Sequence, residues 1–175
     1  MKDVVFFGLV GLVSGIITNF FIGESFVAGT SPGWIFGMAI ALGLFLSLNL
    51  PIQKNWRLVL WVVFSTSSYL LAVLATIISE GSLPASYRGP LSFFIGGSVG
   101  ALVLFIGLRL LFRFEIVSLF YAILLGGILG VIGKYFDSEF IGEEASLMYL
   151  IWQTGIALLI GFFIEDRQSP EKVNS

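Results

Sequence analysis

Residues 90–112 read PLSFFIGGSVGALVLFIGLRLLF, and no residue from Pro90 to Leu108 carries a charge. A helix over this range would be about 35 Å long at 1.5 Å per residue. This length is enough to cross the hydrocarbon core of a bilayer, which is about 30 Å thick. Pro90 fits the first turn of such a helix, because its missing N–H would have no intrahelical partner there. The stretch therefore predicts a transmembrane helix.

Five further apolar stretches of similar length occupy most of the remaining sequence. They cover residues 4–22, 32–50, 57–78, 116–133 and 147–164. None of them has an aspartate or glutamate in its central part, and several connections between them are short and rich in glycine and proline. Together the six stretches predict an all-α integral membrane protein, a compact bundle of six transmembrane helices.

The composition favours the same class of protein. Of the 175 residues, 57% are hydrophobic and 11% are charged, and the mean hydropathy is +1.01. A soluble domain has about 25% charged residues, so this chain has too little charge to cover a water-exposed surface. We therefore expect a lipid bilayer around the protein. We do not expect nucleic acid as a partner, because the net charge is −2 and the sequence has no basic patch.

The sequence contains neither cysteine nor histidine. It therefore has no thiolate nucleophile, and it lacks the commonest general base and metal ligand. The segment Gly96-Gly97-Ser98-Val99-Gly100 fits the GxSxG pattern of serine hydrolases, but that pattern requires a strand-to-helix turn and a histidine. We expect no enzymatic activity, no metal and no cofactor, and we interpret Ser98 as part of a packing surface.

The positions of lysine and arginine predict the orientation. If the N-terminus is cytoplasmic, seven of the nine basic residues lie on the cytoplasmic side, and Arg88 and Lys134 lie on the other. This asymmetry predicts a multi-pass protein of the cytoplasmic (inner) membrane with both termini in the cytoplasm. Residues 1–167 then form one six-helix transmembrane domain, and residues 168–175 form a disordered cytoplasmic tail. The first apolar stretch is longer than the h-region of a signal peptide, so we interpret it as a retained helix.

A weak internal repeat indicates three helical hairpins of the same orientation. Residues 41–50 (ALGLFLSLNL) and 101–110 (ALVLFIGLRL) are identical at six of ten positions. In addition, Gly11 and Gly15 of the first helix align with Gly126 and Gly130 of the fifth. Parallel repeats of this kind occur in membrane transporters. The competing explanation is that a few residue types dominate the chain, so that such matches arise from composition alone.

Small residues recur at four-residue spacing in several of the predicted helices, as Gly126 and Gly130 do in the fifth. In lipid, apolar side chains gain little by leaving the bilayer, and helices associate through close backbone contact at such stripes. We expect the stripes to pack the bundle internally, with a closer contact at Gly126 and Gly130 than at Gly43 or Gly161. The alternative is that one stripe binds another membrane protein or a second copy of the chain.

Polar side chains inside the apolar stretches are costly in lipid and mark candidate functional positions. The candidate ligand-binding residues are Asn19, Ser65, Ser68, Trp152, Gln153 and Thr154. The amide of Gln153 has two donors and a carbonyl acceptor to satisfy, and lipid offers no partner. We expect Gln153 to face the bundle and to bond with Asn19 or with the Ser65 and Ser68 hydroxyls. Structural hydrogen bonding between helices is the alternative to a solute site.

Two functions fit these features. The first is binding or passage of a small solute through an outward-facing polar cavity in the bundle. In size and in its cytoplasmic termini the predicted bundle resembles the substrate-binding components of energy-coupling factor vitamin transporters, without a motif specific to that family. The second function is that of a non-catalytic membrane subunit or assembly factor that holds a partner through its glycine-rich helix faces. A solute-dependent rise in thermal stability would favour the first function.

Overall fold

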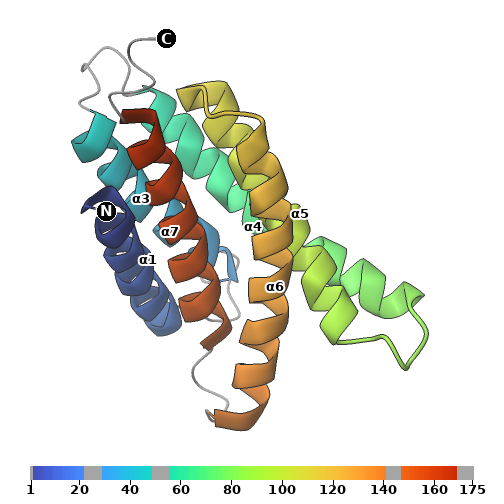
Figure 1. Ribbon diagram of the computed structural model, residues 1–175. Helices are drawn as coiled ribbons and strands as arrows, with labels where there is room; N and C mark the ends of the chain where they lie inside the picture. Colours follow the sequence, from blue (N-terminus) through green and yellow to red (C-terminus); the bar gives the residue numbers. More distant parts are fainter. Residues whose placement is uncertain (1, 22–28, 49–55, 141–146, 169–175) are drawn as a thin grey trace.

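The computed structural model describes residues 2–21, 29–48, 56–140 and 147–168 (Figure 1), and these residues form six α-helices and no strand. The helices are α1 (Lys2–Phe21), α3 (Ser31–Leu48), α4 (Trp56–Ser82), α5 (Pro90–Phe112), α6 (Val117–Phe140) and α7 (Leu147–Gln168). All six are long and apolar enough to cross a membrane. The predicted all-helical fold is therefore confirmed.

The helix boundaries differ from the predicted ones mainly at the ends of three helices. α5 occupies its predicted range and begins at Pro90, as predicted. α4 continues past its predicted end to Ser82, and α6 continues to Phe140. Apolar content defines the predicted span, whereas a helix continues for as long as its residues favour helical backbone. α7 also ends later, at Gln168, and the rest of the predicted tail lies outside the described residues.

The six helices form a ring in which each helix packs against the next one in the chain. α7 also packs against α1, which closes the ring (Figure 1). Neighbouring helices run in opposite directions, so one end of the bundle holds the starts of α1, α4 and α6 and the ends of α3, α5 and α7. We call the half of the bundle at this end the closed half, and the other the open half.

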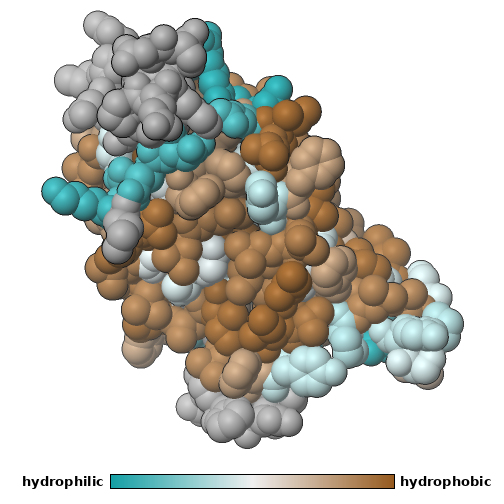
Figure 2. Space-filling model, in the orientation of Figure 1, coloured by the Kyte–Doolittle hydropathy of each residue, from teal (hydrophilic) through white to brown (hydrophobic). Residues whose placement is uncertain are grey.

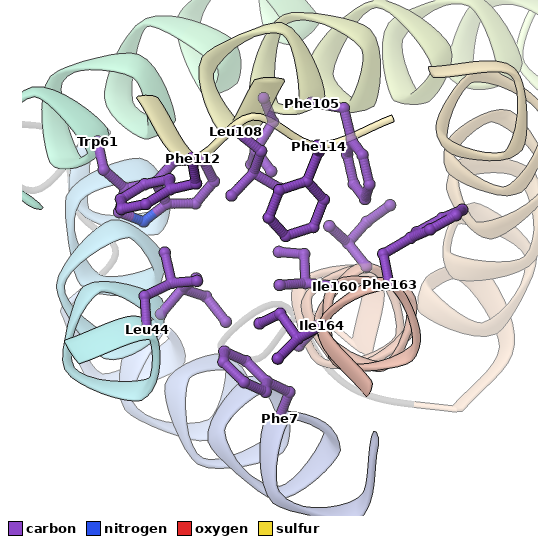
Figure 3. Close-up of a cluster of buried hydrophobic side chains, with 14 of the residues drawn as sticks. Phe7, Leu44, Trp61, Phe105, Leu108, Phe112, Phe114, Ile160, Phe163 and Ile164 are labelled. Carbon is purple, nitrogen blue, oxygen red and sulfur yellow. The ribbon is translucent and has the colours of Figure 1, made fainter. Parts of the chain in front are cut away.

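Large side chains fill the closed half. Phe7 of α1, Leu44 of α3 and Trp61 of α4 meet residues of α5 and α7 such as Phe105 and Ile160, and all five are fully buried. Figure 3 shows these side chains converging on the middle of the bundle. Protein interiors of this kind are packed as densely as organic crystals. The cluster therefore fills the space between the helices in this half.

Glycines bring α5 and α6 together, as the four-residue spacing predicts. A Cβ atom added to Gly126 would lie 2.6 Å from the carbonyl oxygen of Gly97, and one added to Gly130 would meet the carbonyl oxygen of Phe93. Both distances are far below ordinary van der Waals contact, so only glycine fits at either position. Ser98 lies within the same helix interface, where its hydroxyl donates a hydrogen bond to the carbonyl oxygen of Ile123.

The prediction for Gly161 is wrong, because this glycine also lies against backbone. A Cβ atom on Gly161 would be 2.7 Å from the carbonyl oxygen of Asp3 and 2.8 Å from the Cα atom of Val4. The spacing along α7 gives no hint of this contact, since the close approach comes from α1. A Cβ atom on Gly43, by contrast, would lie 2.8 Å from the ring of Phe7, which is a side chain and not backbone.

The glycine pairs that align in the predicted repeat face corresponding neighbours in the ring. Gly11 and Gly15 of α1 face α7, and Gly126 and Gly130 of α6 face α5. Each pair therefore contacts the helix that precedes its own around the ring. The three-hairpin repeat itself stays a prediction.

The residues that flank α5 both have a positive φ. Gly89 precedes the helix with a φ of 77°, which costs glycine little. Arg113 follows it with a φ of 59°, and its backbone N–H donates to the carbonyl oxygen of Arg109. The Arg109 guanidinium in turn donates to the carbonyl oxygen of Phe114 at 3.0 Å. These bonds stabilise the tight turn that leads from α5 into α6.

Candidate functional site

The open half of the bundle contains a cavity of about 330 Å³. Its walls come from α3, α4, α5 and α7. Its aromatic, hydroxyl-bearing, amide and charged lining residues are Phe36, Ser65, Ser68, Tyr69, Thr76, Glu80, Phe93, Tyr149, Trp152 and Gln153. The volume is at the lower end of the range for small-molecule sites, which is roughly 300–1,000 Å³.

Small residues create this space. Pro32 and Gly33 of α3, Ala72 of α4 and Gly96 and Gly97 of α5 line the cavity. At the other end of the same helices, the closed half has phenylalanine, leucine and tryptophan. In addition, α4 diverges from α7 toward the open end of the bundle (Figure 1), which widens this half. The bundle is therefore filled at one end and hollow at the other.

α4 supplies the longest wall of the cavity. Ser65, Ser68, Ala72, Thr76 and Glu80 line it at spacings of three and four residues, which places them on one face of the helix. The helix rises about 22 Å from Ser65 to Glu80, so the cavity is long. Ser65 and Ser68 are buried at its deep end, next to the closed half, and Glu80 is exposed at its mouth.

Five of the lining side chains are aromatic. Tyr69 of α4 and Tyr149 of α7 contact each other, with hydroxyl oxygens 3.2 Å apart and ring centroids 6.2 Å apart. Trp152 packs edge-to-face against Phe36, with centroids 6.1 Å apart. Phe93 of α5 is the fifth. Such rings give a cavity rigid apolar walls, and each tyrosine adds one polar tip.

Gln153 lies at the deep end of the cavity and is only 2% exposed. Its side-chain carbonyl oxygen accepts a hydrogen bond of 2.6 Å from the Ser14 hydroxyl. Its amide nitrogen donates to the Thr18 hydroxyl at 3.2 Å and to the carbonyl oxygen of Pro32 at 3.3 Å. Both N–H groups and the carbonyl oxygen therefore have partners, and the amide ties α7 to α1 and α3.

The predicted hydrogen-bond partners of Gln153 are wrong. The Ser65 and Ser68 hydroxyls donate to backbone carbonyl oxygens of α3 and α5, at 2.8 Å and 2.6 Å. The Asn19 amide donates to a carbonyl oxygen of α1 itself, at 3.1 Å. The prediction failed because it identified which side chains are polar at this depth, but not how each helix is rotated. α1 turns two hydroxyls toward α7 instead of its asparagine.

The cavity brings together four of the six candidate ligand-binding residues, namely Ser65, Ser68, Trp152 and Gln153. Asn19 and Thr154 do not line it. The Thr154 hydroxyl is buried and has no hydrogen-bond partner in the part of the chain that the structure describes. Binding of a ligand by the four lining residues stays a prediction.

Tyr69, Tyr149 and Glu80 line the cavity but are not among the predicted binding residues. Tyrosines near the ends of membrane helices normally anchor the protein at the interface, so the position of Tyr149 in the sequence does not indicate a binding role. Tyr69 lies four residues after Ser65, so helical spacing could have identified it. Glu80 lies beyond the predicted end of its span, and only the longer α4 places it on the cavity face.

The glycines of the six helices pack against other helices of the same chain. Of the glycines inside these helices, only Gly81 has no neighbouring atom within 4 Å of its Cβ position. The scaffold hypothesis needs an unused stripe, so these helix surfaces lend it no support. It stays a prediction, and stoichiometric co-purification with another membrane protein would be the result in its favour.

Comparisons of the chain with protein-family models, with curated proteins and with solved structures gave no match. The function is therefore inferred from the cavity and from the surface of the bundle. Three properties of the site matter for its chemistry. It is closed at one end by the packed cluster, it has aromatic walls, and its deepest polar groups are bonded to the protein itself.

Proposed function

We propose that the chain is a multi-pass membrane protein that captures a small solute in the cavity of its open half. The observation that carries the proposal is the difference between the two halves of the bundle. A cavity of about 330 Å³ lies at one end, and the packed cluster around Trp61 and Phe105 lies at the other. This arrangement suits a binding site that is reached from one side, rather than a continuous pore.

The outer surface supports insertion in a membrane. Large apolar side chains cover the outside of the helices, and Phe20, Leu110 and Phe120 are 82%, 67% and 70% exposed. Figure 2 shows apolar residues across the middle of the visible face, with hydrophilic residues gathered toward the upper left and the lower right. Soluble monomers rarely expose contiguous apolar patches of more than a few hundred Å². Lipid is the solvent that this surface fits.

The basic residues indicate that the closed half faces the cytoplasm, so that the cavity opens outward. Cysteine variants test this orientation without interference, because the sequence has no native cysteine. We expect an impermeant thiol reagent added to intact cells to label Ser82→Cys, at the end of α4, but not Glu115→Cys, between α5 and α6. Both side chains are exposed. Labelling of Glu115→Cys alone would reverse the orientation.

Two neighbouring isoleucines on α4 allow a matched test of solute capture. Ile77 lines the cavity and is 61% exposed, whereas Ile78 is 58% exposed and does not line it. We expect small compounds that raise the Tm of the purified protein to lose this effect in Ile77→Trp, whose indole blocks the mouth. A ligand at 100 times its Kd stabilises a protein by about 2.7 kcal/mol. For a chain of this size that energy is a Tm rise of roughly 5–10 °C.

The Ile78→Trp variant is the control for the bulk and hydrophobicity of the added indole. It should keep the response of the unmodified protein, because its side chain points away from the cavity lining. Equal responses in both variants would place the binding site elsewhere. A screen in which no compound raises the Tm of the unmodified protein would remove the support for solute capture.

A further inference from the structure

We propose that the ligand of this cavity is an amphiphile with a single hydrocarbon chain and a cationic head group. The chain lies along α4, and the head group lies beside Glu80. This inference rests on the proposed solute capture and specifies the chemical class of the solute.

The shape of the cavity fits one chain. The lining face of α4 extends about 22 Å from Ser65 to Glu80, and the cavity volume is about 330 Å³. A lining face of this length along one helix suits an extended chain. A long, thin, apolar ligand makes the most contact with such walls.

The deep end offers a ligand few free polar groups. The Ser65 and Ser68 hydroxyls and the Gln153 amide are bonded to the protein, and the two tyrosine hydroxyls contact each other. The indole nitrogen of Trp152 is buried and has no hydrogen-bond partner in the part of the chain that the structure describes. A sugar or amino acid would lose most of its hydrogen bonds to water there without replacement, which is costly. The end of a hydrocarbon chain loses none.

The mouth favours a cation. Glu80 is the charged member of the lining that the structure describes, and it lies in the last turn of α4, where the helix dipole also attracts positive charge. The ring of Phe93 adds an aromatic wall. A basic side chain also lies near this wall, since the Nζ atom of Lys134 of α6 is 5.2 Å from the centroid of Phe93. Lys134 does not line the cavity.

The depth of the cavity sets the chain length. Trp152 lies level with Ser68, since the Cβ position of Gly100 is 3.5 Å from the indole and 3.7 Å from the Ser68 carbonyl oxygen. Along α4, Ser68 is about 18 Å from Glu80. A twelve-carbon chain is about 14 Å long at roughly 1.2 Å per bond. With its head group at Glu80, such a chain would end near Trp152.

Quenching of Trp152 fluorescence by a brominated amphiphile tests this placement. The probe is 12-bromododecyltrimethylammonium, added to the full chain in phosphatidylcholine nanodiscs. The Trp152 signal is the difference between the unmodified protein and Trp152→Phe. We expect saturable quenching of this signal, at a concentration about fivefold lower than for 12-bromododecanoate. Glu80→Gln should remove the difference between the two probes, whereas Glu115→Gln, an exposed carboxylate at the closed end, should keep it.

Three results would overturn the inference. If neither probe quenches Trp152 saturably, no hydrocarbon chain reaches the deep end. If 12-bromododecanoate binds more tightly and Lys134→Gln weakens it, the head group is an anion. Short butyltrimethylammonium should not displace the quencher, and displacement would show that the chain is unnecessary. None of these results would by itself refute solute capture. The comparison of Ile77→Trp with Ile78→Trp uses other compounds and does not depend on a hydrocarbon chain in the ligand.

Discussion

Replacing Gly126 with leucine is expected to destabilise the bundle by about 3 kcal/mol, because overpacking separates two helices in direct backbone contact. A side chain at this position would meet the Cβ atom of Ala101 and the carbonyl oxygen of Gly97 on α5. Once α5 and α6 move apart, lipid fills the gap and the close contacts are lost. Gly161→Leu should have an effect of similar size, since Gly161 faces backbone atoms of α1.

Gly81→Leu is the matched control for these two variants. Gly81 is also helical, but it has nothing within 4 Å of its Cβ position. Leucine there should leave stability unchanged or raise it slightly, because leucine favours helix more than glycine does. Unfolding of the purified proteins, followed by circular dichroism, measures all three. If Gly126→Leu and Gly81→Leu unfold alike, α5 and α6 are not in close contact.

Removing the amide of Gln153 is expected to cost about 1–3 kcal/mol of stability, which is the penalty for leaving buried polar groups unpaired. In Gln153→Leu, the Thr18 hydroxyl and the carbonyl oxygen of Pro32 lose their donor. The Ser14 hydroxyl is less affected, because it also donates to the carbonyl oxygen of Gly11 at 2.9 Å. Leucine has a similar size, so little of the loss comes from an empty cavity.

Thr154→Val is the control, one residue further along α7. Valine matches threonine in shape, and the Thr154 hydroxyl has no hydrogen-bond partner among the described residues. Its removal should therefore cause no loss of stability. We also expect Gln153→Leu to keep its response to solute, since the amide is fully bonded to the protein. Full stability combined with a lost response would show instead that Gln153 serves the ligand.

Several features of the fold can be predicted from the sequence because they depend on local composition. The apolar stretch of α5 and the proline at its start define the helix. The spacing of Gly126 and Gly130 predicts close packing, because in lipid a stripe of small residues is the main way for two helices to approach. The burial of Gln153 also follows from its depth in an apolar span.

The candidate site is predicted only in part. Four of its residues are recognised as polar or aromatic groups at membrane depth, but Tyr69, Tyr149 and Glu80 are not. Hydropathy separates polar from apolar positions, and it does not tell which helix each position faces. The neighbours of Gln153 show the difference, since Ser14 and Thr18 of α1 bond to it and Asn19 of the same helix does not.

The sequence alone determined that six long apolar helices form, where they lie in the chain, and that Gly126 and Gly130 mark a close approach between two of them. Each of these features depends on residues within one helix. The tertiary structure decided which helices are neighbours, how each is rotated, and that the closed half is filled while the open half is hollow. Such helices are apolar on nearly every side, so their hydropathy does not orient them. Contacts between distant residues, such as Gly161 with Asp3 and Gln153 with Ser14, set their rotation instead.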